Sequence, residues 1–136
     1  MSGVFLDTSG WFAALSPKEA KHAPSFEAYR EWIEDGVPLV TTNLVVAEMQ
    51  TLLTRFRGGA ESVRFLDSLY QDPTHTVVFV DRTLERAAVD RWLRRFRDKR
   101  LSLADAVSFE VMRLRKLRYA LALDEHFAMA GFERVP

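Results

Sequence analysis

The chain has 136 residues, 48% of them hydrophobic, and a formal net charge of zero, which excludes a disordered or fibrous protein and predicts a single domain over residues 1–136. It contains no cysteine, which excludes disulfides, thiolate metal sites and cysteine nucleophiles, so any metal must be bound by oxygen or imidazole ligands. Because no apolar run approaches the roughly 20 residues that cross a bilayer and the first residues lack a signal-peptide pattern, we expect a cytoplasmic protein without a membrane segment.

Short runs of β-branched and aromatic residues alternate with helical patterns, which is typical of an α/β fold with a mainly parallel sheet. The predicted elements, in chain order, are a strand at 3–6, helices at 9–15 and 23–34, a strand at 38–41, helices at 43–57 and 60–70, a strand at 76–80, helices at 83–98 and 103–117, a strand at 119–123 and a short strand at 132–135. Asn43 is the expected N-cap of the third helix, and Gly36 and the Gly58–Gly59 pair are expected to end the second and third helices.

Two aspartates end predicted strands. Asp7 follows the first strand in "VFLDTSGW", and Asp124 follows the strand in "YALALD". Helix capping explains either residue on its own, since an Asp at an N-cap accepts hydrogen bonds from the first free N–H groups. In an open parallel sheet, however, the carboxyl ends of the strands line the crevice where ligands bind. We therefore expect both carboxylates at the same edge, where they are also candidate metal ligands.

Two further acids lie on predicted helices. Glu48 falls at the margin of the apolar arc of its helix, where it is either an edge residue paired with Arg55 or a carboxylate directed into a cleft. Asp105 stands three residues after Ser102, which is the spacing of a capping box. The same position places Asp105 at the mouth of its helix, beside the strand ends, so the capping role and a ligand role are compatible.

The remaining residues of interest have simpler interpretations. His126 stands beside a phenylalanine, so we interpret it as a packed or surface residue, with a metal or phosphate role left open. Trp11, Trp32 and Trp92 recur on apolar helical faces, which indicates core packing and not base stacking.

Charge is distributed unevenly along the chain. Residues 81–118 contain twelve Lys or Arg and six Asp or Glu, a balance of +6, and the remainder is −6. This pattern suits a protein that binds a polyanion at one place and cations at another, although solvated Arg-rich helix faces explain it equally well.

Carboxylates that share a crevice repel each other unless a cation lies among them. Oxygen ligands without thiolates or paired histidines favour Mg²⁺ or Mn²⁺ over zinc.

Four segments, in this order, resemble the PIN-domain family, and within it the VapC-type toxins of bacterial toxin–antitoxin pairs: "VFLDTSGW", "TTNLVVAEMQTLL", "LSLADAVSFEVM" and "ALALDEHFAMAGF". Each segment alone is weakly specific, whereas the ordered set covers nearly the whole chain. The resemblance implies a three-layer α/β/α sandwich with a mainly parallel central sheet. It also implies an endoribonuclease that depends on Mg²⁺ or Mn²⁺, a homodimer, and an antitoxin partner that blocks the acidic crevice.

Carried over to this sequence, the catalytic and metal-binding acids are Asp7, Glu48, Asp105 and Asp124. Thr8 matches the hydroxyl residue that follows the first acid and is expected to orient a water or ligand, and Glu125 is the substitute for Asp124. The reaction implied is metal-assisted hydrolysis of an RNA phosphodiester. Basic residues of 82–100 and 113–118 are the expected phosphate contacts, foremost Arg94, Arg95 and Arg97.

The sequence leaves other functions open. The stretch "FLDTS" resembles the nucleophile loop of haloacid-dehalogenase-like phosphatases, but Ser9 stands where that family needs a second Asp. A housekeeping PIN nuclease of RNA processing is a further alternative. A module that only binds RNA or a protein is another, which the presence of all four acids disfavours. The RNA target is not readable from the sequence.

Overall fold

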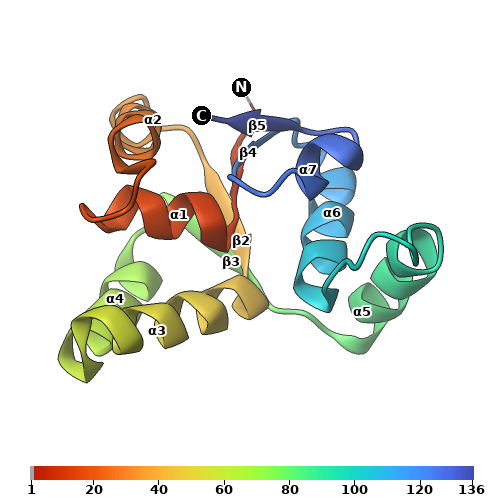
Figure 1. Cartoon of the computed structure of the whole chain (residues 1–136), viewed down its shortest axis with the longest axis horizontal. Helices are drawn as coiled ribbons and strands as arrows, with labels where there is room; N and C mark the ends of the chain where they lie inside the picture. Colours follow the sequence, from red (N-terminus) through yellow and green to blue (C-terminus); the bar gives the residue numbers. More distant parts are fainter. Residues whose placement is uncertain (1) are drawn as a thin grey trace.

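The computed structural model describes residues 2–136, and at its centre lies a five-stranded sheet in which every pairing is parallel (Figure 1). The strand order is β3-β2-β1-β4-β5. The strands are β1 (Val4–Leu6), β2 (Leu39–Thr42), β3 (His75–Val78), β4 (Tyr119–Leu121) and β5 (Glu133–Val135). In the middle strand, β1, Phe5 is paired with Val40 of β2 on one side and with Ala120 of β4 on the other.

Helices cover both faces of the sheet, which confirms the predicted three-layer α/β/α sandwich. One layer consists of α1 (Thr8–Leu15), α2 (His22–Glu34), α3 (Asn43–Arg57) and α4 (Gly59–Gln71). The other consists of α5 (Arg82–Ala88), α6 (Leu103–Arg115) and α7 (His126–Met129) (Figure 1). Within residues 2–136, none of these helices combines the length and the hydrophobicity that crossing a membrane requires.

The core shows why the apolar runs form strands. Val4, Phe5 and Leu6 of β1 are fully buried, because helices cover the central strand from both sides. Trp11, Trp32 and Trp92 are also buried, which confirms the core role predicted for them.

The single helix predicted over 83–98 is wrong. Helix α5 ends at Ala88, continues as one π-helical turn, η1 (Val89–Leu93), and gives way to turns that reach residue 100. The π-helical turn, which is wider than an α-helical turn, accompanies the inward packing of Trp92. The indole Nε1 of Trp92 donates to Oε1 of Glu110 on α6 at 3.0 Å. The Trp92 ring also packs edge-on against Phe109. These partners lie on another helix, so the local periodicity contained no sign of the break.

The start of α3 also differs from the prediction. Thr42 is the N-cap, and its Oγ1 accepts a hydrogen bond from the backbone N–H of Val45. The side chain of Asn43 instead accepts from the backbone N–H of Val80, which ties the start of α3 to the segment after β3. Both residue types cap helices well, so the tertiary partner of Asn43 decides between them.

Gly36 and Gly58 have positive φ and follow α2 and α3, as predicted.

Candidate active site

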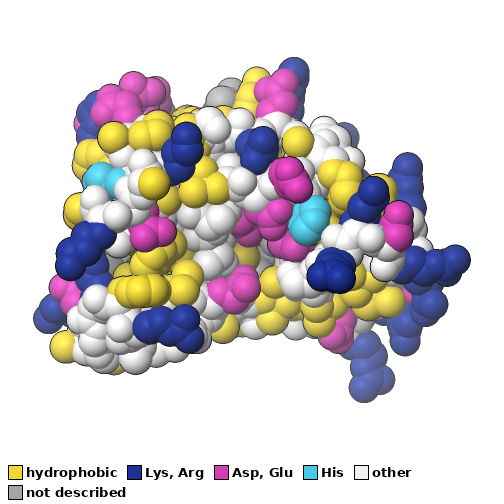
Figure 2. Space-filling view, in the orientation of Figure 1, with side chains coloured by type: hydrophobic (Ala, Val, Ile, Leu, Met, Phe, Trp, Pro, Cys, Tyr) yellow, Lys and Arg dark blue, Asp and Glu magenta, His cyan; other side chains and the backbone are white. Residues whose placement is uncertain are grey.

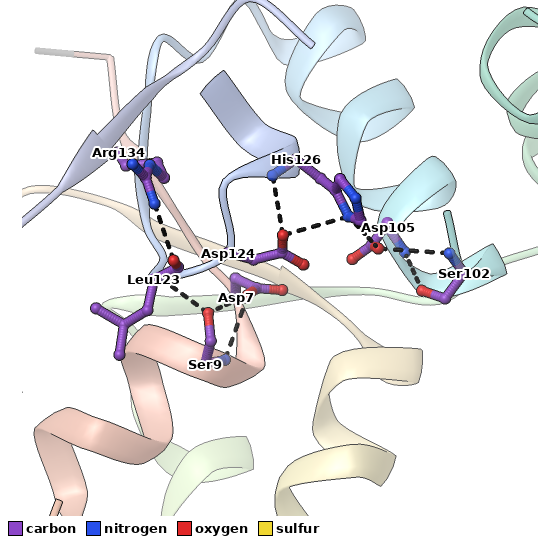
Figure 3. A network of polar contacts seen from close by, with 8 residues as sticks. All are labelled: Asp7, Ser9, Ser102, Asp105, Leu123, Asp124, His126 and Arg134. Atoms are coloured by element: carbon purple, nitrogen blue, oxygen red, sulfur yellow. Dashed lines mark hydrogen bonds and ion pairs between the residues drawn. The ribbon is translucent and has the colours of Figure 1, made fainter. Parts of the chain in front are cut away.

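The carboxyl ends of β1 and β4 meet the first turns of α1 and α6, and acidic residues gather there (Figure 3). Figure 2 shows acidic side chains grouped near the centre of this face, with a histidine beside them. The place is the switch point of the sheet, because the chain runs from β1 to β2 and β3 on one side and later to β4 and β5 on the other. Open α/β sheets bind ligands at such points.

Asp7 is the buried acid of this group. It follows β1 as the N-cap of α1, and one carboxylate oxygen, Oδ2, accepts from the backbone N–H of Ser9 at 3.3 Å and from its hydroxyl at 2.6 Å. The pKa of Asp7 is raised to about 7, chiefly by burial. The bonds from Ser9 oppose this rise and the charges of Asp105 and Asp124 add to it, and about 7 is the net result. The capping role is therefore real, but it leaves Oδ1 without a partner in the described chain.

Ser9 and Gly10 hold this corner together. The Ser9 hydroxyl, which donates to Asp7, also accepts from the backbone N–H of Leu123 at 2.9 Å, so it joins the ends of β1 and β4. Gly10 lets α1 approach β4 closely, because a Cβ there would lie 2.5 Å from the carbonyl carbon and oxygen of Leu121. The sequence predicted no role for either residue, and its only sign of this close packing is the pair of small residues soon after Asp7.

Asp105 enters from the first turn of α6. Its carboxylate accepts from the backbone N–H of Ser102, and its own N–H donates to the Ser102 hydroxyl, so the predicted capping box is confirmed. Burial and the neighbouring charge of Asp124 raise the pKa of Asp105. A second acid nearby destabilises the charged form of a carboxylate that serves only as a cap. The position of Asp105 beside Asp124 therefore indicates a further role.

Asp124 and His126 complete the cluster from the turn between β4 and α7. Oδ1 of Asp124 accepts from the backbone N–H of His126 at 2.9 Å. This tight turn brings the imidazole back, so that Nδ1 of His126 lies 3.3 Å from Asp124 Oδ1 and 3.7 Å from Asp105 Oδ2 (Figure 3). The sequence left the role of His126 open, and the structure places this partly buried imidazole against two acids of the site. The contact with Asp105 arises because α6 brings that residue to it.

Glu48 approaches from α3 through Thr8. The Thr8 hydroxyl donates to Oε1 of Glu48 at 2.9 Å. Desolvation raises the pKa of Glu48, the Thr8 bond lowers it, and the charge of Asp105 raises it again. The Arg55 pairing that the sequence left open is not formed in residues 2–136. Glu48 is thus a carboxylate at the edge of the acidic cluster, which we define as Asp7, Glu48, Asp105 and Asp124.

Two acids of the cluster, together with His126, fit a divalent cation. Asp105, Asp124 and His126 each offer one ligand atom, and these atoms lie within 4.8 Å of one another, whereas Asp7 and Glu48 are not part of this close group. Nδ1 of His126 is buried and has no hydrogen-bond partner within the described residues. No lysine or arginine between residues 2 and 136 forms an ion pair with the four carboxylates, so no permanently charged side chain of the described residues offsets their mutual repulsion. Carboxylate oxygens are the ligands that Mg²⁺ prefers, and Mn²⁺ accepts them together with imidazole.

Comparison with known proteins decides the family. The model of the PIN domain matches residues 4–133. The chain belongs to the PIN-domain family. Its curated relatives include the 23S rRNA-specific endonuclease VapC20 of two Mycobacterium tuberculosis strains, CDC 1551 / Oshkosh and H37Rv, each 34% identical over 132 residues that make up 97% of both chains.

The solved structures agree with this assignment. The crystal structure of Mycobacterium tuberculosis VapC20, a toxin that cleaves the sarcin–ricin loop, superimposes with a TM-score of 0.83. It is 32% identical in sequence, and the match covers 96% of this chain and 97% of that one. The PIN fold predicted from the four sequence segments is therefore confirmed over nearly the whole chain.

The basic residues of this PIN domain are placed less simply than the sequence indicated. Arg94 is paired with Asp90, 2.8 Å away, and Arg95 lies over the ring of Phe96. Arg97 is exposed. All three lie just after η1, and none contacts the acidic cluster. Their binding to RNA stays a prediction.

One acid that sequence reasoning missed is Glu110 on α6. Its side chain is 1% exposed and accepts from Trp92 and Arg113, and Nε of Arg91 lies 3.1 Å away. Burial raises the pKa of Glu110, but the Arg113 and Trp92 bonds and the two arginine charges outweigh it, so the pKa is lowered. Unlike the acidic cluster, this carboxylate is neutralised by the protein itself and serves to fasten η1 to α6.

Proposed function

We propose that this PIN-domain protein is a VapC-type endoribonuclease that uses Mg²⁺ or Mn²⁺ bound by Asp7, Asp105 and Asp124, with Glu48 beside them. The observation that carries the proposal is the convergence of four carboxylates from distant segments without a lysine or arginine partner in residues 2–136. Such an arrangement costs stability unless a cation occupies it. The relationship to VapC20, an endonuclease, supports RNA hydrolysis as the use of that cation.

The residues of the site have distinct tasks. A divalent ion at a carboxylate site of this kind acts as a Lewis acid toward a phosphoryl oxygen and lowers the pKa of a bound water. Ser9 holds Oδ2 of Asp7 by two hydrogen bonds and so fixes the carboxylate that would bind the ion. Thr8 holds one oxygen of Glu48 in the same way. Because burial raises the pKa of Asp7 to about 7, this residue must release its proton when it becomes a ligand near neutral pH.

The proposed substrate is RNA, and 23S rRNA is the first target to test. VapC20 is named as specific for 23S rRNA, and its crystal structure as that of a toxin that cleaves the sarcin–ricin loop. Identity of 34% over 97% of both chains makes a shared target the simplest expectation. The proposal covers only the class of substrate and not the bond that is cut.

We further propose that the protein is the toxin of a toxin–antitoxin pair and acts in the cytoplasm. An acidic cluster without its own cation is a suitable target for an inhibitor, because an arginine can form a bidentate pair with carboxylates that would otherwise bind metal. The antitoxin is therefore expected to place a basic side chain in the cluster. In that case inhibitor and metal should compete, which a titration of Mn²⁺ into the inhibited complex can measure.

The deciding experiment is cleavage of isolated ribosomal RNA by purified protein. Wild type should cut with Mg²⁺ or Mn²⁺ and stop when the ions are chelated, and Asp7→Asn should lose most activity because it removes a ligand charge. Asp67→Asn is the matched control, since Asp67 is an exposed acid on α4 outside the cluster. Equal cleavage by Asp7→Asn and Asp67→Asn would exclude the proposed site, and absence of any cleavage would exclude the proposed activity on this RNA.

A further inference from the structure

A groove of about 480 Å³ opens beside the acidic cluster. It is lined by Lys99, Glu125, His126, Ala128, Met129 and Arg134. His126 lines the groove and also lies against the cluster, because its Nδ1 is 3.3 Å from Asp124 and 3.7 Å from Asp105. The groove is therefore separated from the cluster by one side chain, and a chain molecule that crosses the carboxylates can extend into it.

Arg134 supplies the first cation of this groove. One guanidinium nitrogen, Nη1, donates to the backbone carbonyl of Leu123 at 2.9 Å, which holds the side chain beside the turn that carries Asp124 (Figure 3). No carboxylate of residues 2–136 forms an ion pair with Arg134. Arg118, which directly precedes β4, is by contrast neutralised by Glu133 of β5 at 2.9 Å. Arg134 thus keeps its charge and most of its N–H donors available at the groove.

Lys99 supplies the second cation, from the turns that follow η1. Its side chain is 50% exposed, and the adjacent Asp98 approaches it only to 3.9 Å. Lys99 and Arg134 come from segments 35 positions apart in the sequence and line one groove. The opposing charge is Glu125, while Ala128 and Met129 form an apolar wall. Two cations against one acid leave the groove positive beside a strongly negative cluster.

We propose that this groove binds the RNA backbone next to the bond that is cut, with Lys99 and Arg134 contacting the neighbouring phosphate. The inference rests on the proposed ribonuclease function. An RNA strand meets repulsion from the four carboxylates on both sides of the scissile phosphate, and a bound ion offsets it only at that phosphate. Cations in a groove that shares a wall with the cluster attract the next phosphate and so fix the register of the strand, since phosphate contacts position without reading sequence. Met129 and Ala128 provide an apolar surface for the attached nucleoside.

The first test measures RNA binding without cleavage, in an Asp7→Asn background with Mg²⁺ present and a fluorescent single-stranded RNA as the probe. The double variant Lys99→Gln/Arg134→Gln should bind more weakly, and the slope of log affinity against log salt should become about 0.7 less steep, because the contact with one phosphate is lost. Lys18→Gln/Lys21→Gln removes the same charge from exposed residues that do not line the groove and should leave the slope unchanged. Equal slopes for the two double variants would overturn the proposal.

Glu125→Gln provides a change of opposite sign. Removal of the acid should tighten RNA binding, because Glu125 opposes the phosphate in the groove. Weaker binding by Glu125→Gln would contradict a phosphate site. Arg134→Lys keeps the charge and should retain most of the salt slope that Arg134→Gln loses.

The second test separates failure of the groove from failure of the proposed function. In otherwise wild-type protein, the groove double variant should raise KM for RNA and leave kcat and Mn²⁺ affinity nearly unchanged. If Arg134→Gln lowers Mn²⁺ affinity by disturbing the Leu123 turn, Lys99→Gln alone decides. If wild type cleaves RNA and Lys99→Gln has the same KM as wild type, the phosphate site in the groove is rejected and the ribonuclease activity stands. If wild type binds RNA through the groove but does not cleave it, the ribonuclease activity is rejected and the phosphate site in the groove stands.

Discussion

At the scale of single residues, the unusual property of this protein is an aspartate that holds its proton near neutral pH. Asp7 is buried, its bonds from Ser9 only partly offset that burial, and two further carboxylates face it. Without a cation, ionisation of Asp7 is costly, and with a cation it becomes favourable. Metal binding, the protonation of Asp7 and folding stability are therefore linked.

The first prediction concerns the pH dependence of stability in metal-free protein. The pKa of Asp7 in the folded state, about 7, lies above the ordinary value of 3.8, so between these values the folded state binds more protons than the unfolded state. The contribution of Asp7 to the free energy of unfolding is therefore fully present at low pH. It is lost as pH rises from about 4 through 7. The loss is at most about 4 kcal/mol.

Urea unfolding with chelator present measures this effect. Asp7→Asn should match wild type near pH 4 and become increasingly more stable than wild type toward pH 8, because it cannot acquire the buried charge. At pH 8, Mn²⁺ should raise the free energy of unfolding of wild type, and it should raise that of Asp7→Asn much less. A stability difference that stays constant across this pH range would show that Asp7 ionises normally.

The second prediction separates the two roles of Asp105. Asp105→Asn keeps an acceptor for the backbone N–H of Ser102, so it should cost about 1 kcal/mol or less in unfolding free energy while removing most cleavage and weakening Mn²⁺ binding. Ser102→Ala is the complementary control: it removes the other half of the capping box, should cost about 1 kcal/mol, and should leave metal affinity nearly unchanged. Full activity in a folded Asp105→Asn protein would reduce Asp105 to a cap.

At the scale of elements, the site depends on how closely α1 lies against β4. The hydroxyl of Ser9 bonds the backbone after β4, and Gly10 faces the Leu121 carbonyl with no room for a side chain. Asp7 is carried at the start of this same helix. Any displacement of α1 from β4 therefore moves the carboxylate relative to Asp124, so the packing of two elements controls the geometry of the cluster.

The third prediction compares two glycines. A Cβ at Gly10 would meet the Leu121 carbonyl at 2.5 Å, so Gly10→Ala should lower unfolding free energy by about 1–3 kcal/mol and lower Mn²⁺ affinity as well. Gly59→Ala at the start of α4 meets nothing within 4 Å and should be neutral or stabilising by up to about 1 kcal/mol. Thermal unfolding and Mn²⁺ calorimetry of both variants measure this contrast. Similar stability of the two variants would mean that α1 can move away from β4 at little cost.

At the scale of the whole molecule, the topology explains why residues so far apart in sequence form one site. β1 and β4 are adjacent in the sheet, although more than 110 positions separate them, and the switch in strand order lies between them. The other acids enter from α3 and α6, one from each helical layer. The cluster therefore forms only when both layers are packed on the sheet.

The fourth prediction concerns assembly. We expect a homodimer, from the resemblance to VapC-type toxins and from the large apolar side chains that the single chain exposes. Phe56 and Phe79 are both 63% exposed, and Tyr70 is 53% exposed and stacks on Phe79. Burial of such groups is the usual gain in association. Sedimentation at micromolar concentration should give about twice the chain mass of 15.6 kDa, whereas a mass equal to one chain would contradict the prediction.

The sequence by itself determined the class of fold and the positions of the acids. The order of strands and helices follows from the period of the apolar residues, because that period records which side of each element is buried. Asp7 and Asp124 were placed at one edge of the sheet because parallel strands end together. The capping box of Ser102 and Asp105 lies within one helical turn, so its spacing alone predicted it.

Only the tertiary structure decided what these residues experience. The bond from Leu123 to Ser9, the approach of His126 to Asp105 and the break of the 83–98 helix at Trp92 each join segments that the sequence pattern treats separately. The raised pKa of Asp7 has the same origin, because desolvation depends on everything packed around a group. Local periodicity records which face of a segment is buried, but the identity of its neighbours is set only when the layers pack together.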